Sequence, residues 1–224
     1  MQASAAPIKI VLTGDSTMCN YAPEKPSRGW GQFLAEHFPA GSVEVINLAA
    51  SGRSTKTFRK EGRWKKALAE QPDYIFIQFG HNDSHPPQNK ESTDFATDYQ
   101  ENLKRFIDES RAIGAVPVLV TPMVRRIFSD DGKILETAES PSRPLVAYAD
   151  AVKKVATEKQ VALVDLYTSS KALAEKLGPE ASQKFANRKG DPTHFNEKGA
   201  RAMTTLVVEQ LPKAVPDLKK SGLQ

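Results

Sequence analysis

The 224-residue sequence has a single cysteine, Cys19, so it can form neither an internal disulfide nor a cysteine-based zinc cluster. Its four histidines leave little material for a histidine-rich metal site. No stretch approaches the roughly 18 consecutive apolar residues of a membrane-spanning helix. Lys and Arg number 31 against 27 Asp and Glu, a net charge of +4 that is too small for an obligate duplex-DNA binder unless it is concentrated locally. We therefore expect no metal, membrane or nucleic-acid partner.

The first six residues, Met-Gln-Ala-Ser-Ala-Ala, lack an apolar core of signal-peptide length. Their small side chains nevertheless resemble the mature side of a removed signal. We expect a secreted or periplasmic protein whose leader is absent from this sequence, although a cytoplasmic location fits the single cysteine equally well. The oligomeric state cannot be read from the sequence.

Five short, nearly continuous apolar runs predict parallel strands that are buried on both faces. Helical patterns with three- and four-residue spacing separate them, most clearly over 93–113, from Pro144 onward, and from Asn196, a residue that suits an N-cap, onward. We predict one α/β domain over 1–224, with its core at about 8–211, as a three-layer α/β/α sandwich with a five-stranded parallel, flavodoxin-like sheet. The predicted strands are 8–12, 43–46, 74–79, 116–120 and 161–164.

Three irregular stretches, 80–91, 122–143 and 178–195, are long for such a fold. Ligands of open α/β sheets bind outside the carboxyl ends of the strands, so the segments that follow strands are where chemistry is expected. After the first strand comes Gly14-Asp15-Ser16-Thr17, which could expose Ser16 as a nucleophile. The same residues also suit an ordinary turn or a phosphate-binding loop. The Gly-x-Ser-x-Gly elbow of α/β-hydrolases is absent from the sequence.

Two further segments offer neutral hydrogen-bond donors. Gly52 follows the second strand and Asn82 follows the third, within Gly80-His81-Asn82-Asp83. A backbone N–H at a glycine and a side-chain amide are the groups that form an oxyanion hole. Either residue alone is more often a turn glycine or a backbone cap.

Asp191 precedes His194 by three residues, in a long loop before the last predicted helix. At this spacing a carboxylate can accept the Nδ1–H of the imidazole and leave Nε2 available as a base. The spacing is also common by chance. The remaining histidines are weaker candidates, because His37 lies in an amphipathic helix and His81 and His85 flank Asn82 and could line a site or be solvated.

Taken together, these four blocks resemble the SGNH (GDSL-type) hydrolases, and within them most closely the rhamnogalacturonan acetylesterases of carbohydrate esterase family 12. The resemblance covers nearly the whole chain, from about residue 8 to residue 211. It is carried by the following segments in order: Gly14-Asp15-Ser16-Thr17, Gly52, Gly80-His81-Asn82-Asp83 and Asp191-x-Thr193-His194-Phe195.

The resemblance implies a serine esterase that removes acetyl groups from an acetylated polysaccharide, and pectic rhamnogalacturonan is the expected substrate. Ser16 would be the nucleophile, His194 the base and Asp191 the residue that orients the imidazole. The backbone N–H groups of Ser16 and Gly52 and the amide of Asn82 would form the oxyanion hole. This chemistry requires no metal and no other cofactor.

The positive charge is concentrated near the expected oxyanion glycine. Residues 53–66 contain seven Lys and Arg and one acid, Glu61, a local charge of +6. Such a segment could attract an acidic polysaccharide, or it could be an ordinary solvated helix face. As further substrate-binding candidates we consider Asp15, Arg53, His81 and Arg125, and Arg126 could likewise contact a substrate carboxylate.

Other functions fit parts of the sequence. An acetylxylan esterase or a broad-specificity GDSL esterase or lipase would share the same blocks. Cys19 could replace Ser16 as the nucleophile if His194 were directed at it. Two alternatives come from other classes of protein: a non-catalytic flavodoxin-like ligand binder and an inactive carbohydrate-binding relative. A flavodoxin-like binder would leave Asn82 and the Asp191 and His194 pair without a role.

Overall fold

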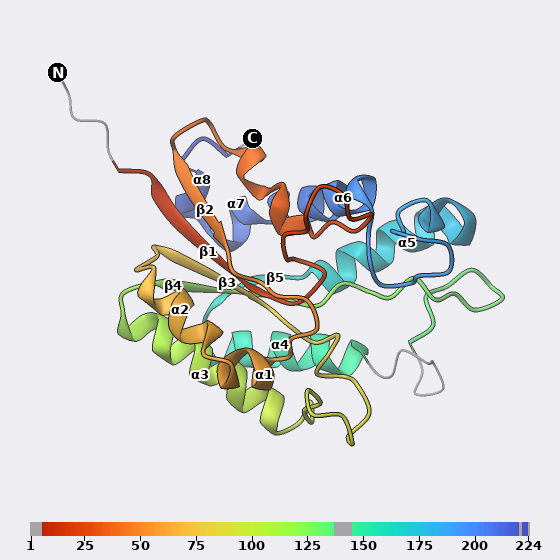
Figure 1. Ribbon diagram of the computed structural model, residues 1–224, viewed down its shortest axis with the longest axis horizontal. Coiled ribbons are helices and arrows are strands. Elements are labelled where there is room, and N and C mark those ends of the chain that lie inside the picture. Colours follow the sequence, from red (N-terminus) through yellow and green to blue (C-terminus); the bar gives the residue numbers. More distant parts are fainter. Residues whose placement is uncertain (1–5, 137–144, 220, 224) are drawn as a thin grey trace.

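The computed structural model describes residues 6–136, 145–219 and 221–223, and a five-stranded parallel sheet lies at its centre (Figure 1). The strand order is β2-β1-β3-β4-β5, the order of flavodoxin-like folds. All four strand pairs are parallel. The strands are β1 (Ile8–Gly14), β2 (Val43–Asn47), β3 (Tyr74–Gln78), β4 (Val116–Val120) and β5 (Ala162–Val164).

Helices cover both faces of this sheet (Figure 1). On one face lie α1 (Thr55–Lys60), α2 (Arg63–Ala69), α3 (Asp98–Ala112) and α4 (Leu145–Lys159). On the other lie the short 3-10 helices η1 (Trp30–Gln32) and η2 (Leu34–His37), together with α5 (Leu166–Gln183), α6 (Glu197–Val208), α7 (Leu211–Ala214) and α8 (Pro216–Lys219). Within the described ranges, no helix is long and apolar enough to cross a membrane.

Alternating side chains of the central strands divide the core into two layers. Val11 of β1 packs into the layer under α1 to α4, whereas Ile10 and Leu12 pack into the layer under α6. Ile75 and Phe76 of β3 separate in the same way. This alternation follows from the two-residue period of a strand, and it explains why both faces of the predicted strands read as apolar. The predicted three-layer α/β/α class is thereby confirmed.

The predicted start of the helix at 93–113 is wrong. The helix begins at Asp98, because Asp94 first forms a turn in which its Oδ1 accepts the backbone N–H groups of Ala96 and Thr97 at 2.9 and 3.0 Å. Such local side-chain to backbone bonds compete with helix formation. Phe95, which lies before the helix, is 38% exposed.

The predicted irregular stretch 178–195 is also partly wrong, since α5 continues to Gln183. Gly178 has a φ of 74° inside this helix and Pro179 follows it. A left-handed glycine ends one helical segment and a proline begins the next, which together produce a kink instead of a loop. The predicted loop 122–143 is described only to residue 136, and the predicted helix start at Pro144 lies outside the described residues.

Asp83 lies in the segment between β3 and α3 and connects that segment to α1. Its Oδ1 accepts the backbone N–H of Thr55 at 3.1 Å and the hydroxyl groups of Thr55 and Thr93 at 2.6 and 2.9 Å. The side chain is fully buried. Burial raises the pKa of Asp83 to about 7 although these donors oppose the shift.

This raised pKa predicts a pH-dependent stability. The carboxyl is protonated more readily in the folded than in the unfolded chain, so its contribution is full below about pH 4 and is lost as the pH rises through about 7. Asp83→Asn keeps an oxygen acceptor but cannot ionise. Between pH 5 and pH 8 the wild-type free energy of unfolding should fall by roughly 2–4 kcal/mol relative to the variant, measured by urea denaturation. Parallel pH dependence of the two proteins would contradict this expectation.

Candidate active site

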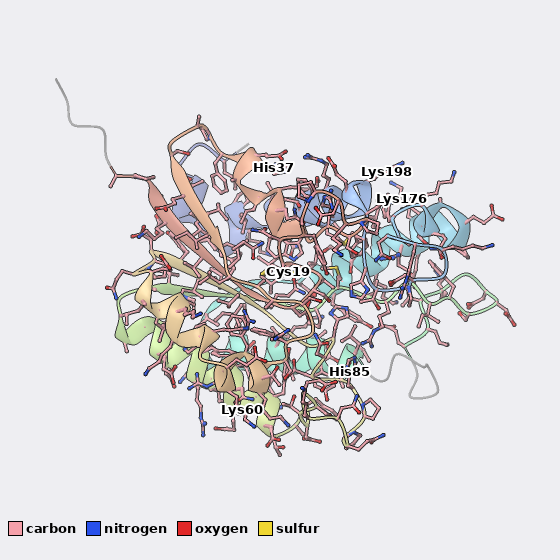
Figure 2. The ribbon with its side chains drawn as sticks, viewed as in Figure 1. Cys19, His37, Lys60, His85, Lys176 and Lys198 are labelled. Carbon is pink, nitrogen blue, oxygen red and sulfur yellow. The ribbon has the colours of Figure 1, made fainter. Side chains whose placement is uncertain are left out.

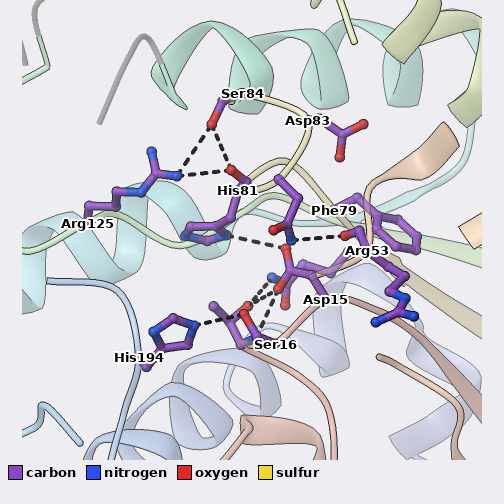
Figure 3. Close-up of polar contacts among 12 residues, drawn as sticks. Asp15, Ser16, Arg53, Phe79, His81, Asp83, Ser84, Arg125 and His194 are labelled. Atoms are coloured by element: carbon purple, nitrogen blue, oxygen red, sulfur yellow. Dashed lines mark hydrogen bonds and ion pairs between the residues drawn. The ribbon is translucent and has the colours of Figure 1, made fainter. Parts of the chain in front are cut away.

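The first three strands of the chain are adjacent in the sheet, and the segments that follow them meet at its carboxyl edge. Because β1 lies between β2 and β3, Ser16 after β1 has neighbours from the segments after both other strands. Asn82 comes from the segment after β3, and its Nδ2 donates to the backbone oxygen of Arg53, which follows β2, at 3.0 Å. His194 reaches the same place from the loop before α6 (Figure 3).

Ser16 sits in a tight turn that is closed by its neighbours. Asp15 Oδ1 accepts the backbone N–H and the hydroxyl of Thr17 at 2.9 and 2.7 Å, and the Asp15 carbonyl accepts the N–H groups of Met18 and Cys19. Tyr21 donates its hydroxyl to the carbonyl oxygen of Ser16 at 2.9 Å. Six per cent of the Ser16 surface remains exposed. The turn thus fixes the serine while a small part of its surface stays accessible.

A chain of hydrogen bonds connects this serine to a carboxylate. His194 Nε2 lies 3.1 Å from Ser16 Oγ, and His194 Nδ1 lies 3.0 Å from Asp191 Oδ2. Asp191 Oδ1 also accepts the backbone N–H groups of Thr193 and His194, both at 2.9 Å. Burial opposes ionisation of Asp191, but these donors outweigh it and hold its pKa below the usual range. The carboxylate is therefore ionised at neutral pH and faces the imidazole.

Backbone contacts hold the loop that carries the histidine. The N–H of Arg28 donates to the carbonyl of Phe195 at 2.8 Å, and Phe195 forms antiparallel bridges with both Arg28 and Ala186. Asn196 caps α6 by accepting the N–H of Gly199. His194 is thus fixed between a two-sided backbone bridge and a helix start.

The two expected oxyanion donors outside the serine turn, Gly52 and Asn82, lie in the segments that follow β2 and β3. The bond to Arg53 O uses one hydrogen of the Asn82 amide and holds the side chain, which is 8% exposed, while its second hydrogen can serve a ligand. Gly52 has a φ of 78°, in the left-handed region that favours glycine, and is exposed. These donors and Ser16 lie on the same edge of the sheet.

The four substrate-binding candidates occupy less direct positions. Asp15 and His81 are 0% and 3% exposed and form a buried pair behind Ser16, with His81 Nδ1 3.5 Å from Asp15 Oδ2. Arg125 donates to His81 O at 3.0 Å (Figure 3). The Arg53 side chain is paired with Glu61 at 3.0 Å. Burial of this kind does not suit contact of Asp15 or His81 with a polymeric substrate; both instead support the turns that carry Ser16 and Asn82.

The basic segment 53–66 is a partly paired helix surface. Glu61 is bound by both Arg53 and Arg63, and Glu109 of α3 is bound by Arg59 through two hydrogen bonds of 2.9 and 2.8 Å. The partner from α3 could not be found by reading the segment alone. Lys56 Nζ donates to the backbone oxygen of Ser92 at 2.7 Å, whereas Lys60 and the α2 lysines, Lys65 and Lys66, are exposed.

Arg126, which we expected as a possible partner of a substrate carboxylate, instead contacts the loop that carries His194. Its Nη2 donates to the backbone oxygens of Asp191 and His194, each at 3.0 Å, and its guanidinium lies 4.3 Å above the ring of Phe195. The sequence shows only two adjacent arginines in a loop after a strand. That pattern is the same whether an arginine binds a ligand or a distant loop of the protein.

Cys19, the alternative nucleophile, is placed unfavourably. Its side chain is 3% exposed, and its thiol points to the carbonyl of Ser16, with Sγ 3.7 Å from that oxygen. Burial raises the pKa of Cys19 to about 11. The thiol is therefore protonated at neutral pH, whereas the bond of His194 goes to Ser16. In the described part of the chain, no group of three or more His, Cys, Asp or Glu residues could hold a metal ion.

Hydrogen bonds thus connect a serine, an imidazole and an ionised carboxylate at the carboxyl edge of a flavodoxin-like sheet. Residues 12–202 match the sequence profile of the GDSL-like Lipase/Acylhydrolase family. The chain belongs to this family and is a carboxylic ester hydrolase.

Curated relatives agree with this assignment. The chain is 39% identical over 229 residues to the rhamnogalacturonan acetylesterase RhgT of Bacillus subtilis, covering 95% of this chain and 93% of the relative. It is 27% identical to a rhamnogalacturonan acetylesterase of Emericella nidulans, with 95% and 86% coverage.

Solved structures show the same fold. The crystal structure of YxiM from Bacillus subtilis has a TM-score of 0.78 and 29% identity, and covers 97% of this chain. The present chain spans 57% of that protein. The acetylxylan esterase Axe2 of Geobacillus stearothermophilus superimposes with a TM-score of 0.71 at 20% identity, covering 92% of this chain and 95% of Axe2. This second likeness is one of fold.

The buried thiol yields a direct test of the nucleophile. We expect Cys19→Ser to retain activity against p-nitrophenyl acetate within about twofold, because the thiol is protonated and does not face His194. Iodoacetamide at pH 7.5 should leave the wild-type rate unchanged over an hour. Loss of activity in proportion to labelling of Cys19, measured by mass spectrometry, would assign the nucleophile to the cysteine.

Proposed function

We propose that this protein is a serine esterase that removes acetyl groups from an acetylated polysaccharide, in the first place pectic rhamnogalacturonan. The observation that carries the proposal is the bond of 3.1 Å between His194 Nε2 and Ser16 Oγ, with Asp191 Oδ2 on the opposite ring nitrogen. The substrate class is supported by sequence identities of 39% to the rhamnogalacturonan acetylesterase RhgT and 38% to YesY, which is described as a probable rhamnogalacturonan acetylesterase.

In the proposed mechanism, Ser16 Oγ attacks the carbonyl carbon of the acetyl ester while His194 Nε2 takes the hydroxyl proton. The resulting imidazolium is stabilised by the ionised Asp191. The imidazolium then gives this proton to the sugar oxygen as the ester C–O bond breaks, so the sugar leaves as an alcohol and the acetyl group stays on Ser16. Water, deprotonated by the same imidazole, then attacks this ester. Acetate is released as the acyl C–O bond breaks, and the imidazolium returns the proton to Ser16 Oγ.

Negative charge develops on the carbonyl oxygen during both attacks. The N–H groups of Ser16 and Gly52 and the second hydrogen of the Asn82 amide are the proposed donors to this oxygen. The bond from Asn82 to Arg53 O supports this role, because it fixes the amide before the substrate arrives. Donors that need no reorientation are the main source of catalysis in such sites.

Acetylxylan esters are the second candidate substrate, favoured by the common fold with Axe2. The basic residues beside Gly52 support an acidic polymer over neutral xylan, because a rhamnogalacturonan backbone carries a carboxylate at every second sugar. A polymeric substrate of this kind would be met outside the cytoplasm, which supports a secreted or periplasmic location. We propose a single domain over 1–224 without a metal or other cofactor.

Substitution of the proposed nucleophile should abolish catalysis while substitution of a donor should only weaken it. Ser16→Ala is expected to show no p-nitrophenol release above background from p-nitrophenyl acetate. Asn82→Ala should retain a remnant, with turnover lowered on the order of 100- to 1000-fold, the usual effect of losing one oxyanion donor. Full activity of the Ser16→Ala protein would eliminate the serine mechanism.

The substrate class is tested by acetate release from acetylated rhamnogalacturonan, homogalacturonan and xylan at equal acetyl concentration. We expect the highest kcat/KM on rhamnogalacturonan. A parallel series of p-nitrophenyl esters should show acetate preferred to longer acyl chains. Preference for long acyl chains would indicate a lipase. A higher kcat/KM on acetylated xylan would make xylan, and not rhamnogalacturonan, the first candidate substrate.

A further inference from the structure

A strongly basic surface adjoins the proposed site. Two surface hollows of about 760 and 560 Å³ meet at Lys56 of α1, one running between α1, α2 and α3 and the other toward the segment that contains Lys90. We call this the Lys56 surface. Its basic side chains are Lys56, Arg59, Lys60, Lys65, Lys90 and Arg105, and its carboxylates are Glu61 and Glu109.

The carboxylates of the Lys56 surface do not neutralise its lysines. Both are already held by arginines, Glu109 by Arg59 and Glu61 by Arg53 and Arg63. In the described part of the chain, no ion pair forms at the exposed residues Lys56, Lys60, Lys65, Lys90 and Arg105. Six cations against two carboxylates equal the net charge of the whole chain, +4.

The Lys56 surface is connected to the site. α1 follows Ser54, two residues after Gly52, and Arg53 O receives the amide of Asn82. A third hollow, of about 430 Å³, is lined by Lys56 and by Ser84, which lies two residues after Asn82, together with the carboxylates of Asp94 and Asp98. Lys60 projects from the α1 side of the molecule, away from the layer that carries Lys176 and Lys198 (Figure 2). A chain leaving the proposed oxyanion hole along α1 would meet Lys56, Arg59 and Lys60 within about 9 Å, the length of this six-residue helix.

We propose that the Lys56 surface binds the carboxylate-bearing backbone of an acidic polysaccharide beyond the sugar that is deacetylated. This inference rests on the proposed function. Separate, exposed lysines suit a flexible polymer with regularly spaced carboxylates, because each contact is a point charge that needs no fixed geometry. The contacts hold the polymer near the nucleophile and act in the binding of long substrates only.

The test compares two triple charge reversals in the full-length protein. Lys60→Glu, Lys65→Glu and Arg105→Glu change the Lys56 surface. Lys176→Glu, Lys184→Glu and Lys213→Glu are the matched control, with the same change of charge at exposed residues of the opposite layer. Initial rates are measured on acetylated rhamnogalacturonan and on p-nitrophenyl acetate, at 20 and 200 mM NaCl.

We expect the first triple variant to raise KM for the polymer on the order of tenfold at low salt and to lose most of its salt dependence. Its kinetics on p-nitrophenyl acetate should equal those of the wild type. The control should change both substrates less than about twofold. Equal effects of the two variants on the polymer would mean attraction by overall charge and would overturn the proposal, as would an unchanged KM of the first variant.

A binding assay separates this inference from the proposed function. Ser16→Ala protein, with and without the first triple reversal, is titrated with polygalacturonate, neutral galactan and a DNA duplex. Binding of polygalacturonate that requires the three basic residues supports the Lys56 surface even if no polysaccharide acetate is released. Binding of DNA in preference to polygalacturonate would overturn it and assign the surface to another polyanion.

A second inference concerns Arg126, which holds the loop of the proposed acid–base pair. The Nη2 of Arg126 donates to the backbone oxygens of both Asp191 and His194. Its backbone N–H donates to Pro192 O at 2.9 Å, and its guanidinium stacks on the ring of Phe195. All four contacts lie within five consecutive residues of one loop. We infer that Arg126 is a positioning residue that sets the distance of His194 from Ser16.

Arg126→Met should lower kcat on p-nitrophenyl acetate on the order of 10- to 100-fold with KM changed less than about twofold, because a displaced base affects the chemical step. Arg126→Lys should recover part of this loss, since an ammonium can still donate to one or both carbonyls. The control is Arg201→Met, which removes an arginine stacked 4.0 Å above Phe33 and paired with Glu36 and Glu197.

The control should lower Tm but not kcat. Wild-type kcat in Arg126→Met, or an equal loss in Arg201→Met, would reduce Arg126 to a structural residue. If the methionine variant does not fold, Arg126→Lys decides the question. A kcat below wild type with KM and Tm preserved supports positioning, and unchanged kinetics overturn it.

Discussion

The hydrogen bond between His194 Nε2 and Ser16 Oγ connects residues that are 178 positions apart in the sequence. The proposed chemistry depends on this distance. On one side the serine is fixed by the first strand and the turn of Asp15. On the other, the histidine is fixed by the bridges of Phe195, the start of α6 and Arg126. The fold therefore constrains both ends of one bond, and the remaining elements supply the rigidity that keeps them there.

Three buried carboxylates near this bond differ in their electrostatic environment. Backbone donors keep the pKa of Asp191 low. Burial would raise the pKa of Asp15, but His81 and Thr17 lower it below its usual value. Asp83 is surrounded mainly by hydroxyl groups and buried, so its pKa rises to about 7. Only the carboxylate beside the imidazole of His194 is suited to stabilise an imidazolium, whereas the other two hold the turns that present Ser16 and Asn82.

The sequence allowed much of the fold to be predicted, because buried parallel strands leave short continuous apolar runs and all five were located within two residues. The site segments could be found because parallel strands end on one edge. The exact helix boundaries were harder to predict. A turn formed by Asp94 moves the start of α3 to Asp98, and Gly178 with Pro179 produces a kink in α5 where we had expected a loop. The pairing of Arg59 with Glu109, the burial of His81 and the clamp of Arg126 depend on tertiary contacts between distant segments, which no local pattern encodes.

The most direct test of the account is to trap the acetyl-enzyme. The protein is mixed with p-nitrophenyl acetate, quenched in acid within milliseconds to seconds and digested, and the acetylated peptide is sequenced by tandem mass spectrometry. Ser16 and Cys19 lie on the same tryptic peptide, so fragment ions must separate them. We predict one acetyl group on Ser16 that is absent from Ser16→Ala and accumulates in His194→Ala more slowly than in the wild type. Acetylation of Cys19, or turnover of the ester with no trapped group on Ser16, would contradict it.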